Sequence, residues 1–247
     1  MNTSATHARR LGKWGLYFWL TTVMIFALLS PQRVAMLGET TKNMYFHVSM
    51  SFTATIAFLA SMWFSIQLLR TKNLDFDLKA DAAAGLGLLF NVLAMITGAI
   101  WARFTWGQFW NWDPKQTSIF ILLLVYLTYF VLRSAIESSE KRARLAAVYN
   151  IFAFPSVIFL YFVLPRLVGG LHPGSDKGDV NPAVSGTTDP MIRIFLYSTT
   201  FGFIALFFWL HSLRYRQLKL AQAVEERIAL RSEHAFQTRA VKTLEHV

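Results

Sequence analysis

Residues 82–102 read AAAGLGLLFNVLAMITGAIWA, an apolar run without one charged side chain. A helix needs about 20 predominantly apolar residues to cross a bilayer, so this run predicts a membrane-spanning helix. Five further runs of this kind lie at roughly 14–30, 44–69, 117–132, 145–164 and 191–212. The composition agrees, with 54% hydrophobic and 15% charged residues. The sequence therefore predicts an all-α integral membrane protein with six transmembrane helices.

The distribution of basic residues predicts the orientation. With six spans, both tails and the loops near 70–81 and 133–144 share one side, and these segments hold 17 of the 24 lysines and arginines. Because basic residues stay in the cytoplasm, we expect both termini to be cytoplasmic. The basic start resembles a signal peptide, but no small-x-small cleavage site follows the first apolar run, so we expect a retained helix.

The residue types that are absent exclude several kinds of site. Without cysteine, the chain has no thiolate ligand, no disulfide and no Cys-x-x-Cys-His motif, and it lacks the glycine loop of a P-loop ATPase. The net charge of +10 lies mostly in the cytoplasmic flanks, so we expect contact with the lipid bilayer and none with nucleic acid. We expect one membrane domain, residues 1–213, and a cytoplasmic helical tail, residues 214–247, that is either solvated or docks a partner.

An aromatic tract, Trp-Gly-Gln-Phe-Trp-Asn-Trp-Asp, occupies residues 106–113 in the connection predicted to face outward. Tryptophan is common at membrane interfaces, but Trp106, Trp110 and Trp112 lie too densely around Gly107 for a random aromatic belt. We therefore expect a short amphipathic segment on the outer face. Its rings would offer a flat wall to a large, flat, apolar ligand.

The end of the tract is typical of a helix start. Asp113 would be the N-cap, Pro114 the first helical residue, and Gln116 the partner in a capping box. This role alone explains the acid, so we expect Asp113 to shape the tract and to take no part in chemistry.

Two of the six histidines fall on the predicted outer side. His47 lies at the outer start of the second span, and His172 lies in the longest outer loop. Either one alone is most simply a hydrogen-bonded interfacial side chain. Together, beside an aromatic wall, they supply what a metalloporphyrin needs, namely two neutral imidazoles for the axial positions and an apolar surface for the ring.

Basic side chains near these histidines could bind the carboxylates of such a ligand. Lys42 and Lys115 are the first candidates because they lie nearest to the predicted ligands in the sequence, and Arg103 and Arg166 are further ones. Each of the four is otherwise an ordinary interfacial anchor.

The tract at 106–113 resembles the tryptophan-rich signature of heme-handling proteins in cytochrome c biogenesis. Over residues 10–213 the chain most resembles the heme exporter protein C family (CcmC), since Met44-Tyr45-Phe46-His47-Val48 precedes the signature and Leu171-His172-Pro173-Gly174 follows it. In this short six-span chain, a histidine, the signature and a second histidine follow one another in consecutive outer loops. This combination makes the resemblance to the family specific.

The resemblance implies a function and a site. Such proteins hold heme b (iron protoporphyrin IX) at the outer face of the bacterial inner membrane and present it to a heme chaperone, CcmE. They associate with the transporter subunits CcmA and CcmB and the small subunit CcmD. Carried over, the iron ligands are His47 and His172. The remaining cofactor-binding residues are Trp106, Gly107, Trp110, Trp112, Asp113, Lys42 and Lys115.

One stretch departs from this pattern. Residues 113–117, Asp-Pro-Lys-Gln-Thr, are more similar to the synthetase-type proteins CcsA and CcmF, which are longer and carry further histidines. A synthetase-like partner set therefore stays an alternative. Two others are a heme transporter or channel, and a scaffolding subunit whose outer histidines are incidental. In the reading we favour, the protein handles a ligand and makes few bonds itself, so its classification as an enzyme stays open.

Overall fold

The computed structural model describes residues 3–29, 38–175 and 189–244, with side chains for 11–29, 38–175 and 189–232. This part of the chain is helical and contains no strand. Its elements are α1 Thr3–Leu29, η1 Glu39–Asn43, α2 Met44–Thr71, α3 Asp75–Trp106, α4 Pro114–Ser134, α5 Ser139–Ile158, the π-helical turn η2 Phe159–Val163, α6 Leu164–Val168 and α7 Pro190–Leu244. Six helical segments are long and apolar enough to cross a membrane, which confirms the predicted fold class.

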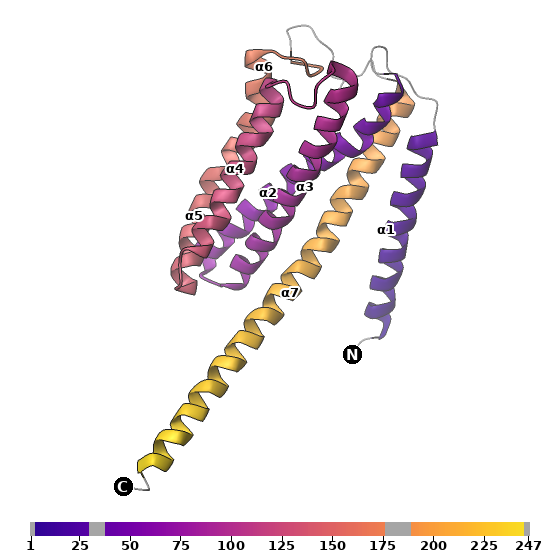
Figure 1. The fold of residues 1–247 in the computed structure, drawn as a ribbon. Helices are drawn as coiled ribbons and strands as arrows, with labels where there is room; N and C mark the ends of the chain where they lie inside the picture. The colour runs from indigo at the N-terminus through magenta and orange to yellow at the C-terminus, as the bar shows by residue number, and fades with distance from the viewer. Residues whose placement is uncertain (1–2, 30–37, 176–188, 245–247) are drawn as a thin grey trace.

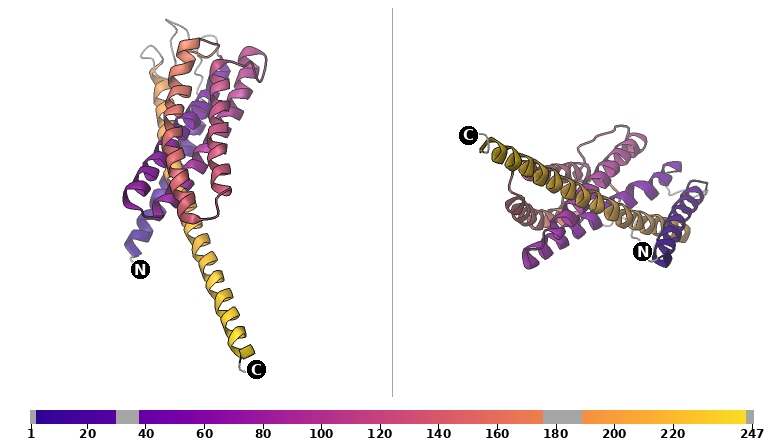
Figure 2. Two further views of the ribbon diagram at one scale, coloured as in Figure 1. Left: turned by 90° about the vertical axis from the view of Figure 1, so that its left-hand side faces the viewer. Right: turned by 90° about the horizontal axis from the view of Figure 1, so that it is seen from below.

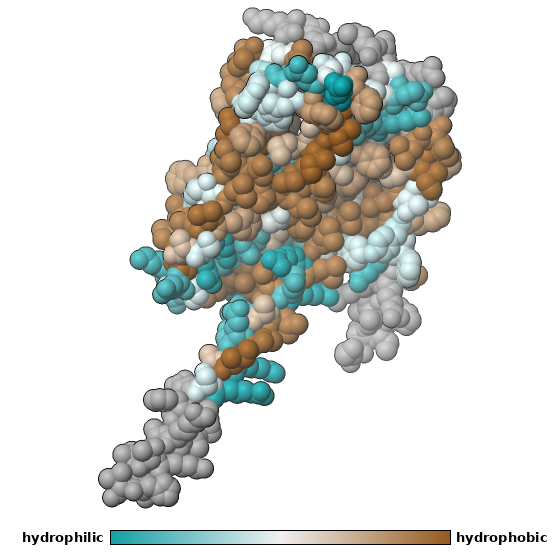
Figure 3. All heavy atoms as spheres, viewed as in Figure 1, coloured by the Kyte–Doolittle hydropathy of each residue, from teal (hydrophilic) through white to brown (hydrophobic). Residues whose placement is uncertain are grey.

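The helices run up and down, so the connections gather at two ends (Figure 1). The two chain ends and the α2–α3 and α4–α5 turns lie at one end. The aromatic connection after α3 and the short α6 lie at the other, which we call the site end. A band of apolar side chains covers the bundle between them (Figure 3). The arrangement is the one that six spans require, and the cytoplasmic assignment of the termini stays a prediction.

Helix α2 lies at the centre, in contact with α3, α5 and α7. Small side chains allow this close approach, since buried alanines line the facing surfaces of α2 and α3. Phe58 of α2 stacks on Tyr126 of α4 with ring centroids 3.6 Å apart, and Gly87 of α3 leaves the room for its ring. Close packing of small and aromatic side chains therefore forms the core of the bundle.

Buried polar bonds fix the register of the bundle away from the site end. The Asn150 amide donates to Ser61 at 2.6 Å and to Ser65 at 2.9 Å, and Ser61 donates to the carbonyl of Ala80. These bonds join α5, α2 and α3. Inside an apolar bundle such groups need partners, so the network favours one alignment of the three helices.

The helices extend past the predicted spans. The expected loop at 70–81 is a tight turn, because α2 continues to Thr71 and the Asn73 side chain accepts from the backbone N–H of Asp75 at the start of α3. The predicted helical tail, residues 214–247, begins within α7, which continues from the last span to Leu244 and projects beyond the bundle (Figure 2). Tyr215 and Lys219 bond the Asp75 carboxylate at 2.6 and 2.9 Å and fasten the helix where it leaves.

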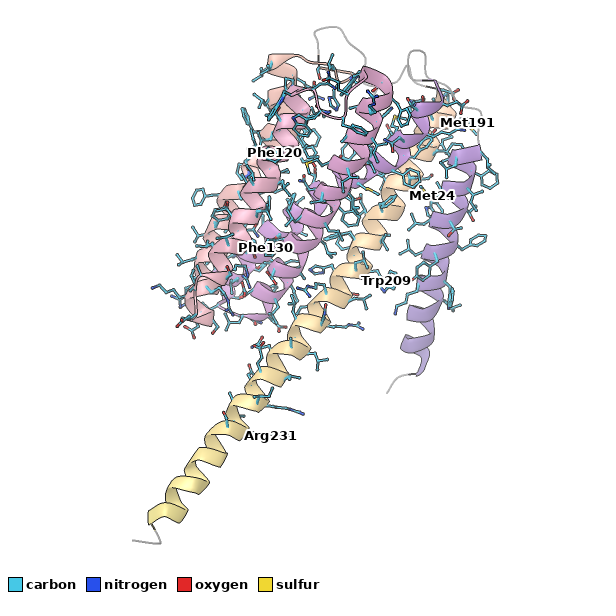
Figure 4. The ribbon with its side chains drawn as sticks, viewed as in Figure 1. Met24, Phe120, Phe130, Met191, Trp209 and Arg231 are labelled. Carbon is cyan, nitrogen blue, oxygen red and sulfur yellow. The ribbon has the colours of Figure 1, made fainter. Side chains whose placement is uncertain are left out.

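Helix α1 lies at the edge of the bundle against α7. Trp19 donates to the carbonyl of Ser198, and Tyr17 meets Trp209 edge to face. Trp209 projects from α7 toward α1 (Figure 4). Most other side chains of α1 are exposed, as expected for a helix with one protein neighbour and lipid around the rest.

Candidate functional site

Two adjoining cavities lie at the site end. The larger has a volume of about 240 Å³ and is lined mainly by α2 and by the segment η2–α6. The smaller, of about 40 Å³, is lined mainly by α3, α4 and η2. Five residues line both cavities: His47, Ser51, Lys115, Tyr161 and His172. The fold therefore brings the two outer histidines and one predicted lysine to a single space.

His47 is oriented by α3. Its Nδ1 lies 2.9 Å from the carbonyl oxygen of Ala94, which can only accept, so Nδ1 carries the proton and Nε2 keeps its lone pair. The Trp101 ring meets the imidazole edge to face at 5.8 Å. Gly98 makes this position possible, because a Cβ there would lie 2.7 Å from Cε1 of His47.

His172 is oriented by a carboxylate. Its Nδ1 lies 2.6 Å from Oδ2 of Asp113, and Trp106 meets its ring edge to face at 4.8 Å. Burial lowers the pKa of His172 below its ordinary value, against the opposing effect of Asp113. The imidazole is therefore neutral at neutral pH, with its proton on Nδ1 and the lone pair on Nε2.

Asp113 does more than the sequence predicts. It caps α4 through the backbone N–H of Lys115, as expected. The same carboxylate also accepts from the backbone N–H of Leu171 at 3.0 Å and from His172. Burial raises the pKa of Asp113, but these hydrogen bonds outweigh it and hold the pKa below the usual range. The expectation that Asp113 only shapes the tract is too narrow, because it also positions a predicted iron ligand.

The predicted capping box is not formed as expected. Gln116 accepts from the backbone N–H of Asn111 at 2.8 Å and donates to the carbonyl of Phe109. Its side chain therefore braces the aromatic connection instead of closing on the N-cap. Residues 107–113 form an irregular link without helix, and Gln116 supplies partners for its backbone.

The aromatic tract surrounds the site without forming one flat wall. Gly107 ends α3 with a left-handed φ of 81°, Trp106 contacts His172, and Trp110 lines the smaller cavity. Trp112 is 71% exposed, has a φ of 53° and meets Trp110 edge to face. A positive φ is unfavourable for tryptophan, so the link is held in a strained form beside the cavity.

The basic candidates separate into two groups. Lys115 lines both cavities and Arg166 lines the larger one. Lys42 pairs with Glu39 at 2.8 Å, and Arg103 donates to the carbonyl of Gly107 and lies over Phe109. Neither lines either of these two cavities, so of the four candidates the structure brings Lys115 and Arg166 to the site.

Several residues at the cavities were not predicted, among them Trp101 and Tyr161. Trp101, which the sequence allows as an ordinary belt residue, lines the larger cavity. Tyr161, in the π-helical turn η2, lines both cavities and donates to Asn91 at 3.0 Å. The tyrosine lies six residues after Pro155, a proline inside α5, and π-turns often mark functional sites. The proline was the only signal in the sequence.

The residues present fit a planar iron ligand. Two imidazoles line one space, each with Nδ1 engaged and Nε2 free, which is how proteins orient histidines for a metal. Indole rings and two cations, Lys115 and Arg166, lie among the lining residues. The fold and this end of the bundle thus define a class, a six-helix membrane protein with a two-histidine cavity at one end.

Comparison with known proteins gives the family. The family model of heme exporter protein C (CcmC) matches residues 2–230. Heme exporter protein C of Paracoccus denitrificans is 31% identical over 195 residues, 79% of each chain, and that of Rhodobacter capsulatus is 34% identical over 138 residues, 56% of this chain and 57% of the relative. The chain belongs to the heme exporter protein C family, which confirms the resemblance.

A further similarity is local. The cytochrome c biogenesis protein CcsA of Prochlorococcus marinus is 38% identical over 109 residues, 44% of this chain and 32% of that relative. The family assignment places this multi-pass membrane protein in heme handling and cytochrome c biogenesis.

Proposed function

We propose that this protein holds heme b between His47 and His172 at the outer face of the bacterial inner membrane and delivers it to a heme chaperone for c-type cytochrome maturation. One observation carries the proposal. Both histidines line the same space, and each has its Nδ1 bonded to an acceptor, which leaves Nε2 available. An isolated interfacial histidine would need no such orientation.

The protein's own groups hold and orient the cargo. Lys115 and Arg166 would bind the heme propionates by charge-assisted hydrogen bonds. Trp101, Trp106 and Trp110 would contact the ring. Heme supplies the iron and the reactive edge, and the protein supplies position and restricts access of water.

The proposed partners follow from family membership and topology. The outer face is assigned by the excess of lysine and arginine at the opposite end. There we expect the chaperone CcmE to take the heme, with CcmA, CcmB and CcmD as the associated transporter and small subunit. The local similarity to CcsA keeps a synthetase-like partner set as the second candidate.

Purification from heme-replete cells tests the ligands. We expect the wild-type protein to show the absorption spectrum of low-spin heme, and His47→Ala and His172→Ala to lose it. His211→Ala is the matched control, because His211 is also half-buried but stacks on Phe64 and bonds the carbonyl of Lys79 near the opposite end.

A wild-type protein without heme, or two variants with unchanged spectra, would refute axial ligation by these residues. Full heme retention after joint replacement of Trp106, Trp110 and Trp112 by leucine would refute the role of the tract. Copurification with tagged CcmE, compared with a tagged synthetase-type subunit, decides between the two partner sets.

A further inference from the structure

A groove opens between α1 and α7 toward the end of the bundle that carries both termini. Nearer the site end the two helices touch, because a Cβ on Gly202 would lie 2.4 Å from Leu20. Farther along they diverge (Figure 1). The groove has a volume of about 390 Å³ and is lined by Gly12, Lys13, Leu16, Trp209, Ser212, Leu213 and Arg216.

The rim of the groove is positively charged. Lys13 comes from α1 and Arg216 from α7, and both side chains are exposed. Neither forms an ion pair with any described carboxylate, and no acidic residue lines the groove. Lys13 Nζ lies 5.6 Å from the centre of the Trp209 ring. Two unpaired cations from different helices therefore face one space.

The rest of the groove is apolar and lies at the edge of the membrane span. Leu16 and Leu213 line its apolar part, about one helical turn closer to the site end than Lys13 and Arg216. The apolar run at 14–30 in the sequence of α1 begins here, and the run at 191–212 in α7 ends here. An aromatic ring and long basic side chains at this depth are typical of the lipid headgroup region.

We propose that this groove is a binding site for an anionic phospholipid of the leaflet on the side of both termini. The phosphate lies between Lys13 and Arg216, and an acyl chain lies along Leu16 and Leu213. Helix α1 has substantial contact only with α7 among the described elements. The lipid therefore joins α1 to the bundle where the protein itself leaves a gap.

Lipid retention tests the site. The full chain is reconstituted into vesicles of equal phosphatidylcholine and phosphatidylglycerol, extracted with mild detergent, and its retained lipids are quantified by mass spectrometry. The wild type retains phosphatidylglycerol in preference. The double variant Lys13→Gln/Arg216→Gln reduces that preference by roughly tenfold, since each basic residue contributes to binding an anionic headgroup.

Two further variants make the test specific. Lys141→Gln/Arg144→Gln removes the same charge at the same end from exposed positions outside the groove, and it keeps the preference. Gly12→Trp places a large side chain in the groove without changing charge, at a position where a Cβ meets no atom within 4 Å. This variant loses the preference.

Equal retention in all four proteins, or a wild type that does not favour phosphatidylglycerol, overturns the proposal. Stabilisation of the detergent-solubilised wild type by inorganic phosphate as strongly as by phosphatidylglycerol reassigns the groove to a free anion. A copurifying polypeptide that Gly12→Trp displaces, in place of lipid, reassigns it to a partner helix.

Discussion

Asp113 joins two structures that the sequence separates by 57 positions or more. Its carboxylate caps α4, accepts from the backbone of Leu171 and holds Nδ1 of His172. Gly170 allows this approach, because a Cβ there would lie 2.6 Å from Oδ1 of Asp113. The aromatic link and the histidine loop therefore share one anion, and its charge sets which nitrogen of His172 is available.

Replacing Asp113 by asparagine should weaken heme binding while the helix cap survives. Asparagine caps helices about as well as aspartate, but it does not hold the His172 tautomer with a negative charge. We expect heme affinity to fall by about 10- to 100-fold, as for other changes behind a metal ligand. Heme titration measures it. Asp189→Asn, at the start of α7, is the matched control, and an equal loss in both variants would contradict the role.

Acid should remove the heme only below the ordinary pKa of histidine. Burial lowers the pKa of His172, so the neutral, ligating form persists as the pH falls through about 6.5 and is lost at a lower value. An absorption titration of the heme-loaded protein follows this loss. A midpoint at or above 6.5 would contradict the expectation, and His211→Ala should leave the midpoint unchanged.

The contact between α2 and α3 positions the other histidine. The carbonyl of Ala94 orients His47, and one turn later Gly98 makes room for the ring. Two small residues of α3 thus determine where a side chain of α2 points. The arrangement depends on the fixed distance between the helices, which the buried alanines and the Asn150 network maintain.

Gly98→Ala should disturb the site more than the fold. The added Cβ would lie 2.7 Å from the His47 ring, which can shift into the adjoining cavity. We expect heme affinity to fall at least about tenfold, as for other displaced metal ligands, with little loss of thermal stability. Gly85→Ala is the control on the same helix, because its Cβ would make an ordinary contact at 3.7 Å with Phe130. It should keep heme affinity and stabilise the helix by roughly 0.5–1 kcal/mol. Matching affinities for the two variants would refute the steric argument.

The sequence predicted the membrane-spanning helices better than it predicted the contacts between side chains. Apolar length alone locates spans, so all six segments were found, with ends several residues short. The family signature pointed to His47, His172 and Lys115, which line the cavities together. Lys42 pairs with Glu39 and lines neither of the two cavities, which its nearness to His47 in the sequence does not reveal, so its role in binding stays a prediction. The Asp113–His172 bond and the position of Tyr161 depend on tertiary packing, which no local pattern encodes.

At the scale of the whole molecule, charge and chemistry lie at opposite ends. The two histidines and the aromatic link occupy the site end, while most lysines and arginines lie in the tails and turns at the other end. This separation is the basis for placing the site outside.

Cysteine labelling should confirm this orientation. The natural chain has no cysteine, so one introduced thiol gives an unambiguous signal. Gln108 is exposed in the aromatic link. We expect Gln108→Cys to react with a membrane-impermeant maleimide in cells whose inner membrane is intact and whose inner-membrane outer face the reagent can reach. Glu137→Cys, exposed in the α4–α5 turn, should react only after the membrane is opened. The reverse pattern would invert the topology.

Because α7 is continuous from Pro190 to Leu244, a change in its tilt inside the bundle is transmitted to its far end. Beyond the contact of Lys219 with Asp75, residues 220–244 of α7 extend about 38 Å at 1.5 Å per residue. A tilt of about 5° at this contact would therefore move the far end of α7 by about 3 Å over that length. Because Tyr215 and Lys219 clamp the helix to Asp75 at the point of exit, that turn of the chain is the fulcrum. Small adjustments of α7 inside the membrane become movements that a neighbouring protein could sense.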